Sequence, residues 1–80
     1  MRGATDFTVL GMFVDRQRIL CRMNIQQVAR TCGVPSDDVR RIIAGKAIGP
    51  DSLASFCAWI GRSPSFFDKH SLATRREVYP

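Results

Sequence analysis

The segment from Val28 to Ile42 constrains the fold more than any other part of the chain. Val28 and Ala29 are followed by Gly33, and then by Val39 and Ile42. Val39 and Ile42 are about one helical turn apart, so both side chains can face inward together. Glycine adopts the left-handed backbone of a tight turn without strain. The spacing therefore predicts two short helices joined at Gly33, with the small side chain of Ala29 allowing the second helix to cross close to the first.

Apolar residues recur at helical spacing along most of the chain, and no alternating strand pattern is present. We therefore expect an all-α, compact five-helix domain at residues 6–69, after a flexible N-terminus at 1–5 and before a polar C-terminal tail at 70–80. The predicted helices run from a Thr5 or Asp6 cap to about Arg22, from Ile25 to about Cys32 after the N-cap Asn24, from about Ser36 to Ala44 after Pro35, and from Pro50 to Gly61, with a short fifth beginning at Ser63-Pro64.

Apolar stripes identify the residues of the first and fourth helices that we expect to face the core. Leu53, Phe56, Cys57 and Ile60 form the clearest stripe, in the fourth helix. The first helix carries a stripe of its own and, in addition, Ile19 and Leu20, which are either extra core or a surface for a partner. The expected inward residues of the first helix are Phe7, Leu10, Val14 with Phe13 beside it, and Cys21.

Composition narrows the class of protein. The chain has 80 residues, of which 45% are hydrophobic and 24% charged, as in a single soluble globular domain. The net charge of +5 favours a polyanionic partner, nucleic acid first and an anionic membrane surface second; the alternative is a merely soluble basic protein.

Several function classes are disfavoured by what the sequence lacks. No apolar run approaches the ~20 residues that span a bilayer, so we expect no membrane segment and a cytoplasmic location. No two cysteines form a C-x-x-C pair, since they stand at Cys21, Cys32 and Cys57, and the one histidine is His70. We therefore expect no metal and no cofactor. No nucleophile has a base beside it in a recognisable motif, which argues against an enzyme.

The chain resembles the lambda-repressor-like, or Cro-type, helix-turn-helix family of phage and bacterial regulators over roughly Val14 to Asp68. Residues 23–29 (MNIQQVA), 33–34 (GV) and 39–42 (VRRI) match its two central helices, and residues 53–63 followed by Phe67 match its closing helix pair. Ile25 departs from the pattern, because the family usually has a phosphate-binding Gln there. Arg62 replaces a residue that is often small and apolar, and Asp37 and Asp38 place negative charge at the start of the predicted reading helix.

The resemblance implies a sequence-specific regulator of transcription that binds double-stranded DNA. We expect a small phage- or prophage-type repressor that acts by occupying an operator, as a homodimer on an inverted repeat with half-sites ~34 Å apart. On this interpretation Arg40 and Arg41 contact bases and phosphates, and Lys46 contacts phosphate. Ser36 either contacts DNA or caps the helix, and Asp37 mainly offsets the helix dipole. Gln26 and Gln27, on the preceding helix, complete the predicted DNA-binding set.

The alternative is a protein-interaction module with the same fold, such as an antirepressor or a host-directed phage protein that grips another regulator. Ile25, the Asp37-Asp38 pair and the apolar Ile19 and Leu20 favour it. The residues expected at a partner or dimer contact are Trp59, Phe66 and Phe67, although adjacent phenylalanines cannot easily share one core, so one of the two is expected to be buried.

Overall fold

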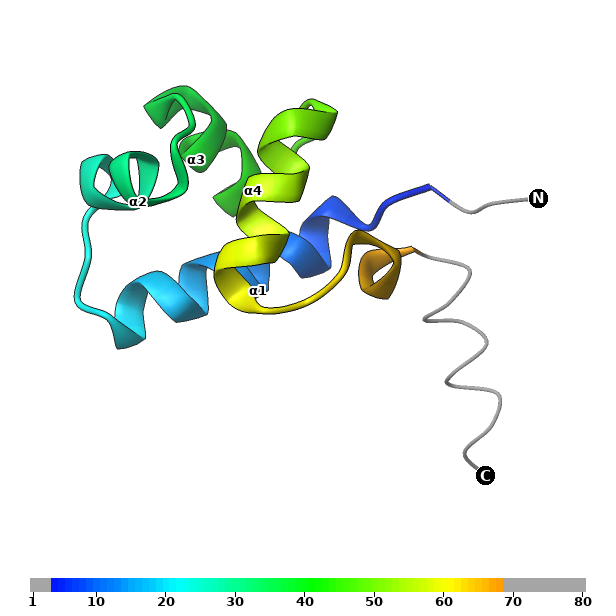
Figure 1. The fold of residues 1–80 in the computed structure, drawn as a ribbon, viewed down its shortest axis with the longest axis horizontal. Helices are drawn as coiled ribbons and strands as arrows, with labels where there is room; N and C mark the ends of the chain where they lie inside the picture. The colour runs from blue at the N-terminus through cyan, green and yellow to red at the C-terminus, as the bar shows by residue number, and fades with distance from the viewer. Residues whose placement is uncertain (1–3, 69–80) are drawn as a thin grey trace.

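The computed structural model describes residues 4–68, which form four α-helices and one turn of 3₁₀ helix, with no strand among them. The predicted all-α class is confirmed, but the expected fifth helix is a single 3₁₀ turn that ends where Asp68 takes an extended backbone conformation. The elements are α1 (Phe7–Leu20), α2 (Ile25–Cys32), α3 (Ser36–Ile43), α4 (Pro50–Ile60) and the 3₁₀ turn η1 (Pro64–Phe67) (Figure 1).

Helix α1 begins where the sequence predicts and ends two residues earlier. The Asp6 carboxylate accepts a hydrogen bond from the backbone N–H of Val9 (3.2 Å), which identifies Asp6 rather than Thr5 as the N-cap. The α-helix stops at Leu20 because Arg22 adopts a left-handed backbone, with φ of 57°. That conformation turns the chain toward α2 and leaves Cys21 exposed, so the expectation that Cys21 faces the core is wrong.

The connection between α2 and α3 follows the prediction. Gly33 is the C-cap of α2 with φ of 70° and ψ of 36°. A Cβ at Gly33 would meet nothing within 4 Å, so the backbone conformation, and not space, requires glycine here. The N–H of Val34 donates to the carbonyl of Ala29 (3.0 Å), and Pro35 then leads directly into α3. Three residues therefore reverse the chain between two eight-residue helices.

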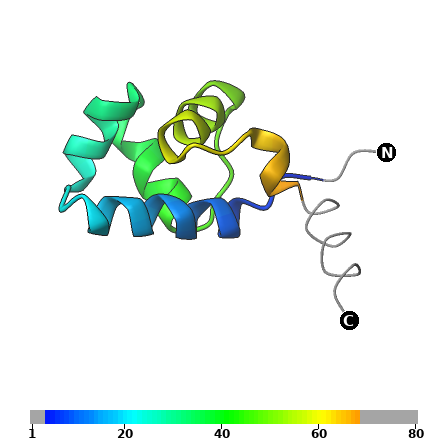
Figure 2. The same ribbon diagram turned by 60° about the horizontal axis from the view of Figure 1, so that its bottom comes forward.

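Figure 2 shows α1 running along one side of the molecule, and the core is formed by buried residues from all four helices and η1. Val28 and Ala29 from α2, Val39 and Ile42 from α3, and Phe56 and Cys57 from α4 are buried, as the spacing predicts. Leu53 and Ile60 are only partly buried and pack against this core. The fully buried large side chains are Phe56, Phe67, Leu10, Ile42, Val14, Val28, Val39 and Cys57.

Gly11 allows the backbones of α1 and α3 to approach each other closely in the core. A Cβ at this position would lie 1.9 Å from the carbonyl oxygen of Ile42 and 3.0 Å from its carbonyl carbon. Helix α3 therefore rests directly on the backbone of α1. Because α1 supports α3 from behind, the opposite side of α3 is free to face outward.

The two ends of the described chain meet. Thr5 forms an isolated antiparallel bridge with Asp68, and the N–H of Asp6 donates to the carbonyl of Phe67 (2.6 Å). Thr5 is thus tied to the helical unit and is not part of a loose end. The predicted tail at 70–80 lies outside the described residues.

Candidate nucleic-acid interface

Helix α3 divides its side chains between the core and the surface. Val39 and Ile42 have no exposed surface, whereas Asp37, Arg40 and Arg41 are exposed along the other side. The inward pair is as predicted from their spacing. The exposed side chains place two cations and one anion on the outer face of an amphipathic helix.

Two hydrogen bonds fix the first turn of α3 to its neighbours. The hydroxyl of Ser36 donates to the side-chain carbonyl of Gln26 (3.0 Å), which joins α3 to α2. The hydroxyl of Ser52, a buried residue of α4, donates to the carboxylate of Asp38. Asp38 is therefore a structural residue whose charge is directed toward α4. Of the two acidic residues at the start of α3, only Asp37 is on the exposed face.

Asp37 and Arg40 form the one ion pair on this face. The Arg40 Nη1 lies 3.2 Å from the Asp37 Oδ1, and the two side chains are 56% and 87% exposed. An ion pair this exposed contributes ~0–1 kcal/mol because water and salt screen it. Arg40 can therefore leave Asp37 at little cost when a better acceptor arrives.

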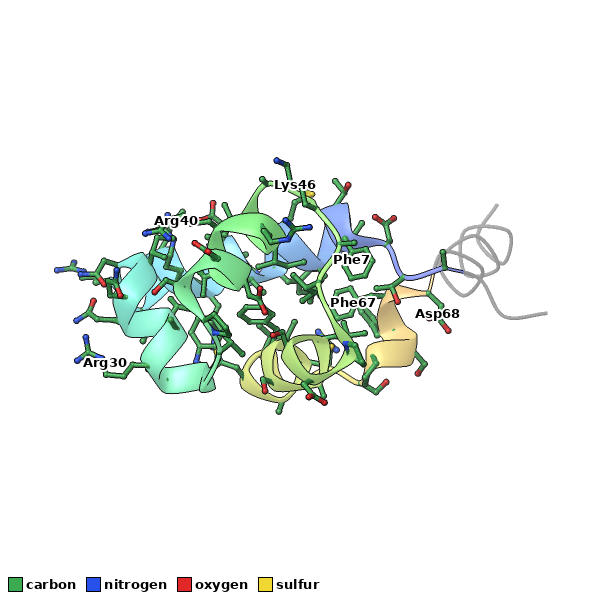
Figure 3. All side chains as sticks on the ribbon, turned by 90° about the horizontal axis from the view of Figure 1, so that it is seen from above. Phe7, Arg30, Arg40, Lys46, Phe67 and Asp68 are labelled. Carbon is green, nitrogen blue, oxygen red and sulfur yellow. The ribbon has the colours of Figure 1, made fainter. Side chains whose placement is uncertain are left out.

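The end of α3 adds two more cations. The Arg41 Nε donates to the carbonyl of Ala47 (3.2 Å), so Arg41 leans over the loop between α3 and α4. Lys46 lies in that loop with its side chain exposed. Figure 3 shows Arg40 and Lys46 projecting from one edge of the molecule, whereas Phe67 lies inside it. Arg40, Arg41 and Lys46 together form a basic surface along α3, named below the α3 surface.

Gln26 and Gln27, at the start of α2, both use their side-chain carbonyl oxygen within the fold. Asn24 and Gln27 form a capping box, in which the Asn24 side chain accepts from the Gln27 N–H and the Gln27 side chain accepts from the Asn24 N–H (both 2.8 Å). The Gln27 carbonyl oxygen is therefore engaged by the helix cap, whereas its side-chain amide N–H groups have no partner among the hydrogen bonds of the described residues. Gln26 uses its carbonyl oxygen for Ser36, which leaves its amide N–H groups available to an external acceptor.

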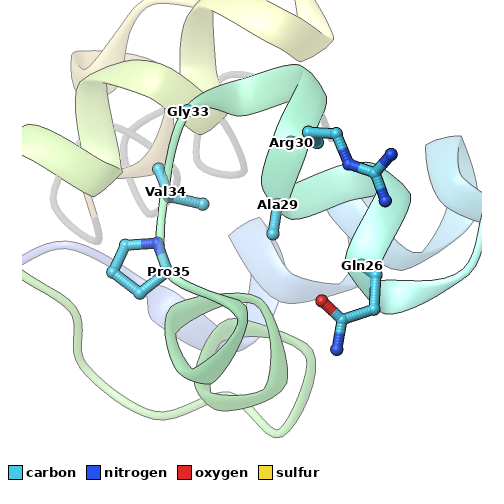
Figure 4. A pocket seen from close by; sticks show the side chains of 6 residues that line it. All are labelled: Gln26, Ala29, Arg30, Gly33, Val34 and Pro35. Atoms are coloured by element: carbon cyan, nitrogen blue, oxygen red, sulfur yellow. The ribbon is translucent and has the colours of Figure 1, made fainter.

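An open hollow lies on the outer side of α2 and the turn that follows it. Figure 4 shows Gln26 and Arg30 projecting from α2 beside this hollow, with Ala29 at its base. The residues that line it are Gln26, Ala29, Arg30, Gly33, Val34 and Pro35. Its polar side chains, Gln26 and Arg30, both come from α2.

Of the three residues predicted to contact a partner, one is fully buried and two are partly buried. Phe67 is fully buried, so it offers no surface to a partner, and Trp59 is partly buried against the core. Phe66 is partly exposed and packs edge-on against Phe13 and Phe67, with ring centroids 5.7 and 5.0 Å apart. The Arg62 guanidinium lies over the Phe66 ring, 5.0 Å from its centroid. As predicted, one of the adjacent phenylalanines is core and the other is accessible.

Within residues 4–68, no three His, Cys, Asp or Glu side chains gather as metal ligands, and no helix there is long and apolar enough to cross a membrane. His70 lies outside the described residues. Comparison of the chain with protein-family models, with curated proteins and with solved structures finds no match.

Proposed function

We propose that α2, the Gly33 turn and α3 form a helix-turn-helix unit of the lambda-repressor-like type, and that the chain is a sequence-specific regulator that binds double-stranded DNA. The observation that carries the proposal is the arrangement of α3. This helix is buried on one side by Val39 and Ile42 and exposes Arg40 and Arg41 on the other. The major groove of DNA is ~12 Å wide and admits one α-helix.

Arg40 is the residue proposed to read bases. Its guanidinium can form two parallel hydrogen bonds with the O6 and N7 acceptors of guanine, which lysine cannot match in geometry. Asp37 lies beside it and can accept from the amino group of a neighbouring cytosine. Exchange of the exposed Asp37–Arg40 pair for base contacts replaces a weak interaction with a specific one.

Arg41, Lys46 and Gln26 are proposed to hold the phosphate backbone. Arg41 and Lys46 supply positive charge at the end of α3, and the free amide N–H groups of Gln26 supply neutral donors at its start. Phosphate contacts at both ends of a reading helix fix its position along the groove. Gln26 would thus act in place of the family's phosphate-binding Gln, from the position next to Ile25.

The proposed output is repression by occupation of an operator. Two copies on an inverted repeat would place their reading helices ~34 Å apart. Trp59 and the accessible edge of Phe66 are the candidates for the contact between copies. Each copy contributes one α3 surface. A two-fold symmetric pair of copies is therefore expected to bind DNA whose sequence has inverted symmetry.

Selection of bound fragments from a random duplex pool tests the proposal. We expect the pool to converge on one sequence with inverted symmetry, and binding to weaken with salt by ~0.9 logarithmic units per phosphate neutralised. A pool that stays random over successive rounds at moderate salt would contradict sequence-specific binding.

A further inference from the structure

Helix α1 exposes an apolar face that nothing in the described chain covers. Met12, Ile19 and Leu20 are 66%, 58% and 67% exposed, and they are the large hydrophobic side chains with the greatest exposure among the described residues. All three lie about 120–160° around the helix axis from buried Val14, on the side away from the core. A helix that is apolar on both sides is normally buried on both sides.

The arrangement of this face fits a second helix. Met12, Arg16, Ile19 and Leu20 follow each other at four, three and one residues, which spans about two turns and ~12 Å of helix. In Figure 2, α1 runs along one side of the molecule with α2, α3 and α4 together on the other side. The face formed by these four residues is named here the α1 face.

A hollow at one end of the α1 face provides a place for an anchoring side chain. It is lined by Met12, Phe13 and Arg16 and has a volume of about 310 Å³. This is at the lower end of the ~300–1,000 Å³ range of ligand pockets, so it suits a single side chain of a partner better than a cofactor. Helix-in-groove recognition uses such anchors at i, i+3, i+4 and i+7.

Charge determines the kind of partner. Arg16 is exposed in the middle of the α1 face and forms no ion pair with a described residue. The nearest acidic residue in sequence, Asp15, is held by Arg18 at 2.8 Å, and Arg18 also donates to the carbonyl of Met23 (3.2 Å). An apolar surface is complementary to an apolar helix that carries a carboxylate when the guanidinium at its centre, like that of Arg16, has no ion-pair partner within residues 4–68.

A second copy of this chain fits the α1 face poorly. In a two-fold symmetric contact, a residue at the centre of the face meets its own equivalent, which places Arg16 against Arg16.

We propose that the α1 face docks an amphipathic helix of another protein, with apolar residues against Met12, Ile19 and Leu20 and an Asp or Glu side chain against Arg16. This site is separate from the α3 surface. A chain bound to DNA through α3 would therefore still present α1 to a protein partner, and the site stands whether or not the chain binds DNA.

A peptide library tests this proposal directly. The library contains helical peptides of about 16 residues, ~24 Å long, with a fixed leucine stripe and random residues beside it. We expect selection on the wild-type chain to enrich Asp or Glu beside the stripe. The selected peptide should lose binding to the Leu20→Ser variant. Arg16→Ala should weaken it about fivefold, the effect of one ion pair near a surface.

The control variant is Arg30→Ala, which removes the same charge from an exposed position on α2. It should bind the peptide as the wild type does, and circular dichroism should show that all variants remain folded. The proposal is overturned if no peptide is enriched, if the enriched peptides lack acidic residues, or if Leu20→Ser leaves their binding unchanged. It is equally overturned if sedimentation shows a dimer of the chain that Leu20→Ser dissociates.

Discussion

Substitution of Gly11 by alanine tests how closely α1 and α3 pack. The new Cβ would lie 1.9 Å from the Ile42 carbonyl oxygen, whereas real Cβ contacts are not found below 3.0 Å. The two helices must therefore separate by roughly 1 Å, which loosens the packing of Leu10 and Val14 against Val39. Neither atom in the clash can rotate away, because one is backbone and the other is bonded to it.

The magnitude follows from two opposing effects. Overpacking of a core costs about 1–3 kcal/mol, and separation of two backbones falls at the upper end of that range or beyond it. Replacement of glycine by alanine inside a helix stabilises the helix by about 1 kcal/mol, because alanine has the higher helix propensity. We therefore expect Gly11→Ala to lower the free energy of unfolding by about 2 kcal/mol, which for a chain this small corresponds to a fall in Tm of roughly 8–16 °C.

Urea denaturation followed by circular dichroism is the assay. Gly49→Ala is the matched control, because Gly49 has φ of −73° and a Cβ there would meet nothing within 4 Å. Its small N-cap penalty and the reduced entropy of the unfolded chain nearly cancel, so a change below ~1 kcal/mol is expected. A Gly11→Ala variant as stable as the parent, or more stable, would refute the close approach of α1 and α3.

Three further predictions concern the contact between α3 and α4, the turn before α3 and the burial of the cysteines. Ser52→Ala leaves the partly buried Asp38 carboxylate without its donor and should lower the free energy of unfolding by about 1–2 kcal/mol in urea titrations; an unchanged midpoint would contradict the hydrogen bond. Gly33→Ala forces an alanine to φ of 70° and should cost about 1 kcal/mol or somewhat more by the same titration, although no atom crowds the site; a neutral result would argue against the left-handed turn. Cys21 should react with a thiol reagent in the native chain while Cys57 stays protected, because Cys57 is buried and burial raises its pKa above 9.0; equal rates would contradict this placement.

The raised pKa of Cys57 also sets a pH dependence. A group whose pKa is higher in the folded state than in the unfolded state contributes stability at pH values below its unfolded-state pKa. That contribution is lost as the pH rises through its folded-state pKa. We therefore expect the free energy of unfolding to fall above about pH 9 in thermal melts of the wild-type chain, and to fall less in Cys57→Ala. Identical pH profiles for the two proteins would contradict burial of the neutral thiol.

The central helices could be predicted because their determinants are local. Asn24 and Pro50 define starts, Gly33 and Gly61 define ends, and each acts through the backbone within one turn of its own position. Apolar spacing then gave the inward residues of α2 and α3. The same reasoning placed the α1 end too late, because the left-handed backbone of Arg22 is unusual for a residue other than glycine.

The pairing of side chains between helices could not be predicted from one sequence. Asp37 and Asp38 are chemically alike and adjacent, yet one faces outward toward Arg40 and the other toward Ser52 on α4. Their places on α3 differ by about 100° around the helix axis, and the partner of each side chain depends on which neighbouring residue lies on that side. Gly11 carried a signal that could have been used, since a glycine within an apolar helix costs stability unless another backbone lies close to it.

Arg40 is the proposed reader of bases, and the affinity of an Arg40 variant for DNA measures this role directly. Arg40→Ala should lose about 1–3 kcal/mol on the selected sequence and much less on random duplex, because a base contact is lost. Arg16→Ala removes the same charge from the opposite side of the fold and should bind both duplexes nearly as the wild type does. Equal losses for the two variants, or an equal loss on both duplexes for Arg40→Ala, would contradict the assignment of α3 as the reading helix.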